Sequence, residues 1–217
     1  MSIAGPTPRT TVKRRAQRGV YEHDAIVRIL DEGLVCHMAF VVDGQPFVLP
    51  TAYARIADQL YLHGSPSNRM LRTGASGIGL CVTVTLLDGL VLARSAFHHS
   101  MNYRSVVLLG TAVRVDDPAE KRAAFRALVE HVCPGRYAGV RPPTEEEMTG
   151  TLVLRLPITE GSAKVRSGPP IDDEGDYAWP VWAGVLPLTT HPGTPIADPR
   201  LDPEHGVPAY VANYTRG

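Results

Sequence analysis

Apolar side chains between Glu22 and Glu32 recur at the three- and four-residue spacing of one helix face. This pattern predicts a helix over residues 22–32, and Gly33 follows where a C-terminal cap glycine is common. Residues 34–42 and 45–55 are rich in apolar and β-branched side chains, and Asp43-Gly44 lies between them. Because Asp-Gly is a strong hairpin signal, the two segments are predicted to pair as antiparallel strands.

Strand-like segments continue through the next hundred residues. Asp88-Gly89 is a second hairpin signal, placed between two apolar segments. The further predicted strands are residues 59–63, 78–87, 90–94, 103–115 and 151–158. Six or seven strands joined by short turns do not show the strand–helix alternation of a parallel sheet. The pattern therefore predicts a mainly β protein, an antiparallel barrel with flanking helices.

Three helical segments are predicted between these strands. A short helix follows Ser65, which suits an N-cap position and precedes a proline. A longer helix runs from Asp117 to about His131, because an acidic cap and a proline precede apolar residues at helical spacing. One more helical turn is predicted after Thr144, where Glu147 completes a capping box.

The chain divides into three predicted parts. Residues 1–20 carry five basic residues and few apolar ones, which is typical of a solvated arm. Residues 21–167 hold the predicted strands and form the barrel domain. Residues 168–217 are rich in proline, so we expect an extended tail that packs on the barrel or on a partner subunit. The apolar residues 179–188 are where this tail is expected to be pinned.

Charge and cysteine content narrow the function classes. The 22 Lys and Arg residues match the 22 Asp and Glu residues, so no net charge favours nucleic acid or an anionic membrane. Salt-sensitive DNA binding by the basic arm stays open as an alternative. Three widely spaced cysteines predict neither a disulfide framework nor a zinc site. Residues 80–93 are too short to span a membrane and no signal peptide is evident, so we expect a cytoplasmic protein.

Residues 60–70 have the composition of an anion site. A predicted strand ends at His63, Gly64 permits a close turn, and hydroxyl, amide and guanidinium groups follow it. Helix N-termini with such side chains bind phosphate, because their free N–H groups and dipole favour an anion. An ordinary capped helix explains the same residues, so both interpretations stay open.

Residues 93–106 form a second polar cluster between two apolar segments, with side chains that suit a polar ligand or an aromatic ring. His98 and His99 are adjacent, so they point to opposite sides of an extended chain, and no metal site is predicted. A haem with one of these residues or His37 as its axial ligand stays an open alternative.

Four segments resemble, in order, the flavin-nucleotide-binding proteins related to pyridoxamine-5′-phosphate oxidase and to nitroimidazole-resistance reductases. The segments are residues 50–53 with 60–65, residues 81–93, residues 100–106, and residues 164–166 followed by 182–188. Together with the first helix they span most of residues 15–190. The C-terminal substrate motif of true pyridoxamine-phosphate oxidases is not evident in the tail, so vitamin B6 oxidation is not implied.

The resemblance implies an FMN-binding split barrel that forms a homodimer with the cofactor at the subunit interface. It implies a ribityl-phosphate end formed by His63, Gly64, Ser65, Asn68 and Arg69. It places Pro50, Thr51 and Thr83 near the flavin ring, with Tyr103, Arg104 and Ser105 completing the pocket. It also places Lys164, Arg166 and Trp182 near the cofactor, with the partner chain as one source of them.

The function that the resemblance implies is an FMN-dependent oxidoreductase acting on a small aromatic or nitroaromatic compound. The cofactor carries the chemistry in such proteins, and no catalytic side chain is assigned here. A non-catalytic flavin carrier or sensor is one alternative. A haem- or deazaflavin-binding version of the same barrel is another. Only Arg69 supplies a formal positive charge within the phosphate segment, which leaves room for a different cofactor.

Overall fold

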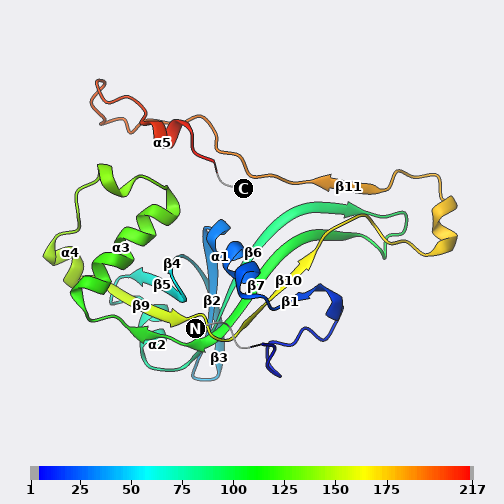
Figure 1. Ribbon diagram of the computed structural model, residues 1–217, viewed down its shortest axis with the longest axis horizontal. Coiled ribbons are helices and arrows are strands. Elements are labelled where there is room, and N and C mark those ends of the chain that lie inside the picture. Colours follow the sequence, from blue (N-terminus) through cyan, green and yellow to red (C-terminus); the bar gives the residue numbers. More distant parts are fainter. Residues whose placement is uncertain (1–4, 216–217) are drawn as a thin grey trace.

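The structure is a computed structural model that describes residues 5–215. The large sheet has the strand order β1 (Gly19–Val20), β10 (Gly161–Arg166), β7 (Ser100–Thr111), β6 (Gly79–Leu92), β2 (Val35–Val42) and β3 (Gln45–Ala52), and β11 (Gly184–Pro187) pairs with β6. The small sheet has the order β4 (Ala54–Ile56), β5 (Gln59–Gly64), β9 (Leu152–Pro157) and β8 (Val113–Arg114). Every described strand pair is antiparallel, which confirms the predicted fold class (Figure 1).

Helices and 3-10 turns complete the described part of the chain, with the last helix lying in the tail away from the sheets (Figure 1). The helices are α1 (His23–Glu32), α2 (Arg69–Ala75), α3 (Pro118–Val132), α4 (Glu145–Thr149) and α5 (Ala209–Ala212), with 3-10 turns η1 (Ala16–Arg18), η2 (Tyr137–Gly139) and η3 (Glu174–Ala178). The predicted first helix, the helix after Asp117 and the capping box of Thr144 are confirmed. The hairpin at Asp43-Gly44 is also confirmed, with both residues in the left-handed region at φ 50° and 77°.

The main core lies between the two sheets and α1. Leu30 of α1, Met38 of β2 and Leu154 of β9 are each 0% exposed within it. Along β2, buried residues alternate with exposed ones, because successive side chains of a strand point to opposite faces. One face of the large sheet therefore points into the core. The other face, which we call the open face, points away from it and carries Val35, His37 and Val107.

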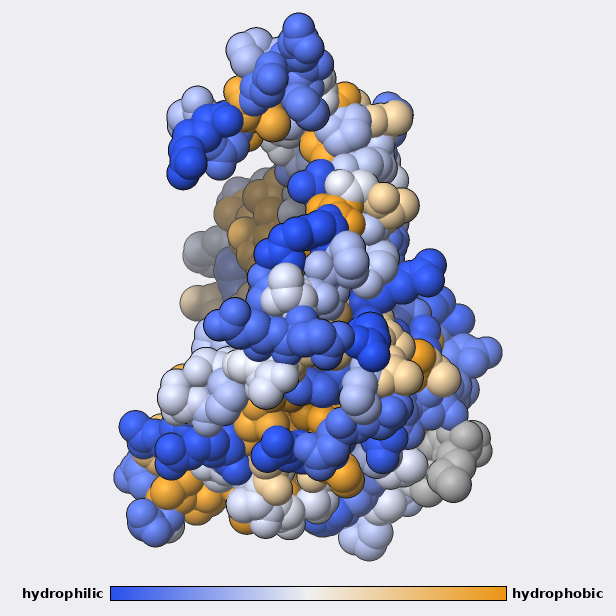
Figure 2. Space-filling view, turned by 90° about the vertical axis from the view of Figure 1, so that its left-hand side faces the viewer, coloured by the Kyte–Doolittle hydropathy of each residue, from blue (hydrophilic) through white to orange (hydrophobic). Residues whose placement is uncertain are grey.

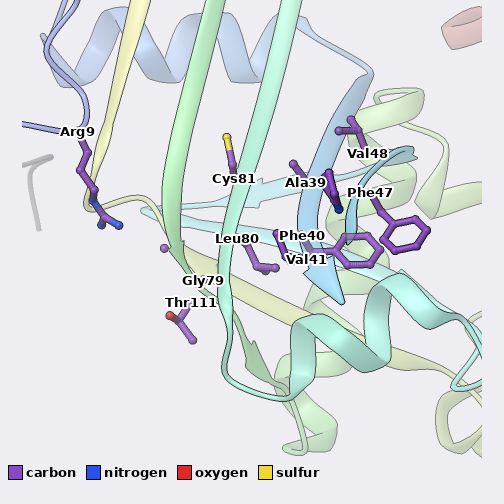
Figure 3. A pocket seen from close by; sticks show the side chains of 12 residues that line it. Arg9, Ala39, Phe40, Val41, Phe47, Val48, Gly79, Leu80, Cys81 and Thr111 are labelled. Carbon is purple, nitrogen blue, oxygen red and sulfur yellow. The ribbon is translucent and has the colours of Figure 1, made fainter. Parts of the chain in front are cut away.

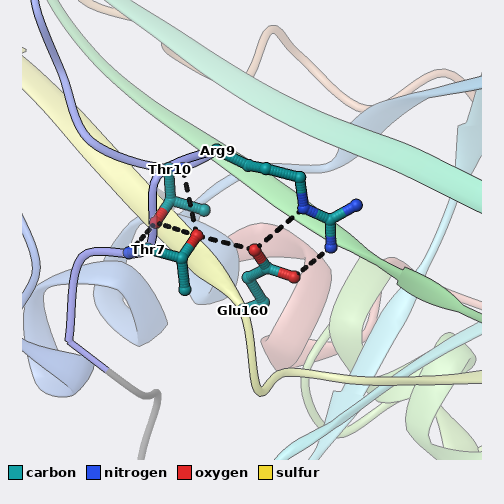
Figure 4. Close-up of polar contacts among 4 residues, drawn as sticks. All are labelled: Thr7, Arg9, Thr10 and Glu160. Carbon is teal, nitrogen blue, oxygen red and sulfur yellow. Dashed lines mark hydrogen bonds and ion pairs between the residues drawn. The ribbon is translucent and has the colours of Figure 1, made fainter.

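The N-terminal segment lies against the edge of the large sheet, while its basic residues Lys13, Arg14 and Arg15 are exposed. Glu160 accepts hydrogen bonds from the Thr7 hydroxyl at 2.7 Å and from the Arg9 guanidinium (Figure 4). Thr10 is 5% exposed, and Gly19 of β1 pairs with Lys164 of β10. These contacts dock a segment whose composition alone indicated solvation. Residues 1–4 of the predicted arm lie outside the described residues.

The C-terminal tail is extended and contacts the barrel at separate points. Asp172, whose side chain is fully buried, accepts hydrogen bonds from the backbone N–H and guanidinium of Arg94 at 3.0 and 2.9 Å. β11 then lies along β6, within the apolar residues expected to pin the tail. Seen from the side of α3 and α4, the tail projects above the barrel with a hollow beneath it (Figure 2). No helix in residues 5–215 is both long and apolar enough to cross a membrane.

Three local predictions are wrong. Asp88-Gly89 does not form a hairpin: β6 continues through it, and the register with β7 shifts between Leu87 and Gly89 as in a β-bulge. Ser65 does not cap α2. Asn68 does, because its side-chain oxygen accepts hydrogen bonds from the N–H groups of Met70 and Leu71 at 2.9 and 3.4 Å. β10 and β11 lie after the segment that was predicted as the last strand.

Candidate functional site

A row of residues crosses the open face through the middle of the large sheet. Pro50 pairs with His37, His37 pairs with Thr83, and Thr83 pairs with Val107. Directly paired residues point to the same side of a sheet, so these four side chains lie together. The row therefore brings Pro50 and Thr83, both implied near a flavin ring, to either side of His37. Thr51 is one residue further along β3 and points to the other side.

Two cavities border this face, and β2 contributes to both. The small cavity, of about 430 Å³, lies between Arg9 on one side and Phe47 and Val48 on the other, with Ala39 and Cys81 at its centre (Figure 3). The large cavity, of about 710 Å³, is enclosed by the end of α1, the first half of β2 with His37, the bulged part of β6, Arg104, and two tail stretches, 188–192 and 214–215. Both volumes lie in the range of small-molecule sites, about 300–1,000 Å³.

The predicted phosphate segment offers less to an anion than its composition indicated. Asn68 already occupies the N–H groups of Met70 and Leu71, so these donors are not free. The hydroxyls of Ser65 and Ser67 are hydrogen-bonded to each other at 2.7 Å. The charged donor of the segment is the guanidinium of Arg69, whose central carbon lies 4.8 Å from the ring centre of Phe47. A positive charge therefore lies beside a residue that lines the small cavity.

His63 does not join the open face. Its ring meets Phe125 of α3 edge-on, with 6.0 Å between ring centres. Its Nδ1 atom is buried without a hydrogen-bond partner among the described residues, and burial lowers the pKa of the imidazole. Gly64, the next residue, faces α2, where an added Cβ would lie 2.9 Å from Leu71. Glycine is thus required here by the close packing of α2 on β5.

Arg104 is held between two carboxylates. Its guanidinium donates to Asp88 at 2.7 and 3.0 Å and to Glu32, one of these bonds being 2.6 Å long. Hydrogen bonds to Glu32 and then to Asp88 raise the pKa of Arg104 above its ordinary value. The network links the end of α1, the bulge of β6 and β7. Arg104 lines the large cavity, but its donors are already engaged.

The remaining implied residues lie along β7 and β10 or in the tail. Ser105 pairs with Lys164, and Tyr103 pairs with Arg166. Arg166 is 6% exposed and donates to the carbonyls of Gly168 and Pro169, so it fixes the start of the tail. Burial, and then the charge of Arg18, lower the pKa of Arg166. Trp182 precedes β11 and is 66% exposed.

Several lining residues were not predicted from the sequence. Cys81 and Phe47 line the small cavity, while His191 of the tail lines the large one. Successive residues of a strand alternate between its two faces, so Cys81 of β6 lies on the same face as Thr83. This alternation could have predicted Cys81 from the sequence. Nothing in the sequence around His191 indicates that the tail turns back toward the sheet.

The antiparallel barrel, with cavities beside the open face of its large sheet, defines a split-barrel protein. The chain belongs to the pyridoxamine 5′-phosphate oxidase family, whose family model matches residues 22–165. No curated protein matches the chain.

Two solved structures resemble the chain over nearly its whole length. The flavocytochrome Anf3 from Azotobacter vinelandii is 40% identical, with a TM-score of 0.92 over 98% of this chain and 99% of that one. The FAD and haem binding protein from Mycobacterium smegmatis is 36% identical, with a TM-score of 0.88 over 92% of this chain and 98% of that one. A putative 5-nitroimidazole antibiotic resistance protein from Bacteroides thetaiotaomicron is 22% identical, with a TM-score of 0.58 over 68% and 86%, and shows the shared fold alone.

Proposed function

We propose that this protein is a redox protein that binds a flavin nucleotide and a haem beside the open face of its large sheet. The observation that carries the proposal is that cavities of about 430 and 710 Å³ border one sheet and share β2. The chain is 40% and 36% identical to proteins described as a flavocytochrome and as an FAD and haem binding protein. When bound, a flavin supplies hydride and single-electron chemistry, and a haem supplies single-electron chemistry.

The residues around the small cavity fit a flavin nucleotide. Val48, on the open face, offers apolar surface to a planar ring, and Phe47, whose ring stacks on Phe40, lines the edge of the cavity. Arg69, stacked on Phe47, offers a charge to a phosphate, which charged donors bind more strongly than neutral ones. Thr83, next to Cys81 along one face of β6, supplies a hydroxyl for a polar ring edge. These side chains would hold and orient the cofactor.

Two details of the proposal are the identity of the flavin nucleotide, FMN or FAD, and the compound that reacts with it. The sequence resemblance implies FMN, whereas the 36% identical protein is described as binding FAD. Action on a small aromatic or nitroaromatic compound also follows from the sequence resemblance. A similarity of 22% to a putative nitroimidazole resistance protein concerns the fold, so it adds no weight to that substrate class.

The protein purified without added cofactor is expected to show flavin bands and a Soret band that co-migrate with it. Chromatography of the released flavin distinguishes FMN from FAD. Arg69→Ala is expected to weaken flavin binding by about 10- to 150-fold, because a hydrogen bond to a charged group contributes about 1.5–3 kcal/mol. Arg72→Ala, which removes another exposed arginine from α2, is the matched control. A colourless protein that binds neither added flavin nor added haemin would contradict the proposal.

We also propose that two copies of the chain associate through the open face. Val35, Val48 and Val107 on this face are 49%, 59% and 36% exposed, although β-branched apolar side chains usually gain by burial. A second copy would cover them and exclude water from the cofactors. The homodimer implied by the sequence resemblance has this same arrangement, with cofactors at the interface.

Light scattering is expected to give a mass twice the 23.5 kDa of the chain. Val107→Glu is expected to yield monomers, because it places an unpaired charge in the buried interface. Val113→Glu changes a residue on the small sheet that is 49% exposed, so it is expected to remain dimeric. A monomeric wild-type protein at micromolar concentration would rule out this interface.

A further inference from the structure

The large cavity lies between a wall made by the sheet and a wall made by the tail. Val35 and His37 of β2 and Leu87 of β6 belong to the sheet wall. Leu188 and His191 belong to the tail wall. The tail is held beside β6 because the N–H of Leu188 donates to the carbonyl of Asp88 at 3.0 Å, next to the paired residues of β11. Apolar side chains on both walls suit the two faces of a flat macrocycle.

One imidazole stands on each wall. The side chain of His37 makes no hydrogen bond or ion pair with the described residues, and two neighbouring strands fix its backbone. His191 has a hydrogen bond of 2.8 Å between its Nε2 atom and the Thr189 hydroxyl, which leaves Nδ1 available. Tyr214 also lines the cavity, but its hydroxyl already donates to the carbonyl of Val132 at 3.1 Å.

Building on the proposed function, we infer that the haem occupies the large cavity, with His37 as its axial ligand from the sheet and His191 as the ligand from the tail. Neutral imidazole is a common axial ligand of haem iron. The hydroxyl of Thr190 suits a propionate, whereas Glu32 and Asp88 in the same lining are already bonded to Arg104. His37 is the principal ligand, since its strand is fixed, and His191 depends on the position of an extended tail.

Other histidines named from the sequence do not reach this cavity. His98 lies within 3.3 Å of Asp173, and its neighbour His99 is hydrogen-bonded to the carbonyl of Ser95 at 3.0 Å. Neither belongs to the cavity wall. His98→Ala is therefore a matched control that removes a histidine without touching the site.

The test is haemin titration of the purified full-length protein, followed by absorption and electron paramagnetic resonance spectra. We expect a six-coordinate low-spin haem in the wild type and in His98→Ala. His191→Ala is expected to give a five-coordinate high-spin spectrum. His37→Gly is expected to lose at least tenfold in haem affinity, and added imidazole should restore part of it. Flavin content, measured in the same samples, reports that each variant is folded.

The outcomes test haem binding and the assignment of the haem to the large cavity separately. If the wild type binds no haem, the haem part of the proposed function fails. If the wild type binds haem and both His37→Gly and His191→Ala keep the wild-type spectrum and affinity, the cavity assignment fails while haem binding stands. A high-spin wild type that depends on His37 alone would overturn the assignment of His191.

Discussion

Leu154→Ala is expected to lower the free energy of unfolding by about 3–5 kcal/mol, the usual cost of removing a buried leucine side chain. Leu154 is 0% exposed and lies on β9, paired with Leu62 of β5, where the small sheet packs toward the large one. A side chain enclosed by two sheets and a helix leaves a cavity that its neighbours cannot refill. Denaturant unfolding followed by circular dichroism measures the loss at equal cofactor loading.

A glycine that packs against Leu154 allows a second test of this packing. A Cβ added at Gly74 of α2 would lie 2.7 Å from the Cδ1 of Leu154 and 2.9 Å from the Cε of Met38. Gly74→Ala is therefore expected to cost about 1–3 kcal/mol by overpacking. In the Leu154→Ala background one of the two clashes is gone, so the double variant should lose less than the sum of the single losses.

Additive losses would mean that Leu154 and Gly74 do not touch in solution. Leu201→Ala serves as the control for the substitution itself. Leu201 lies in the tail and is 45% exposed. Its replacement is expected to change the free energy of unfolding by less than about 0.5 kcal/mol.

The sequence predicted the elements that depend on local signals. The helix before Gly33, the Asp43-Gly44 hairpin and the capping box at Thr144 are all formed. Asp88-Gly89 carries the same local signal as Asp43-Gly44, yet it lies within one continuous strand. The reason is tertiary: a Cβ at Gly89 would lie 3.0 Å from the carbonyl oxygen of Leu186 in β11. Glycine at this position lets β11 approach β6 closely, and this contact is visible only in the folded chain.

The candidate site was harder to predict, because residues that are close in the sequence lie in different parts of the structure. His63 turns toward α3, whereas Arg69, six positions later, stacks on Phe47 beside the small cavity. Alternation along strands correctly groups Pro50, His37 and Thr83 only once the strand register is known. Register depends on pairing between distant segments, so no local pattern could supply it.

Arg104→Met is expected to lower the free energy of unfolding by about 2–3 kcal/mol, because it leaves two partly buried carboxylates without their shared donor. The side chains of Arg104, Glu32 and Asp88 are 32%, 27% and 33% exposed, so solvent reduces the cost below that of a fully buried pair. The stability of Arg104→Lys should fall between those of the wild type and Arg104→Met. An ammonium cannot reproduce the planar set of N–H donors with which the guanidinium bonds both carboxylates.

The triple variant Arg104→Met, Glu32→Gln, Asp88→Asn decides what the network does. If the loss comes from unpaired charge, neutralising both acids should recover most of the stability. A loss of less than about 0.5 kcal/mol in Arg104→Met would show that water screens the network completely.

Flavin affinity is the second property to measure in the Arg104 variants. Because the guanidinium donors of Arg104 are already engaged, the correctly folded variant should bind flavin within about threefold of the wild type, a change worth about 0.6 kcal/mol. Arg69→Ala, by contrast, should not retain that affinity.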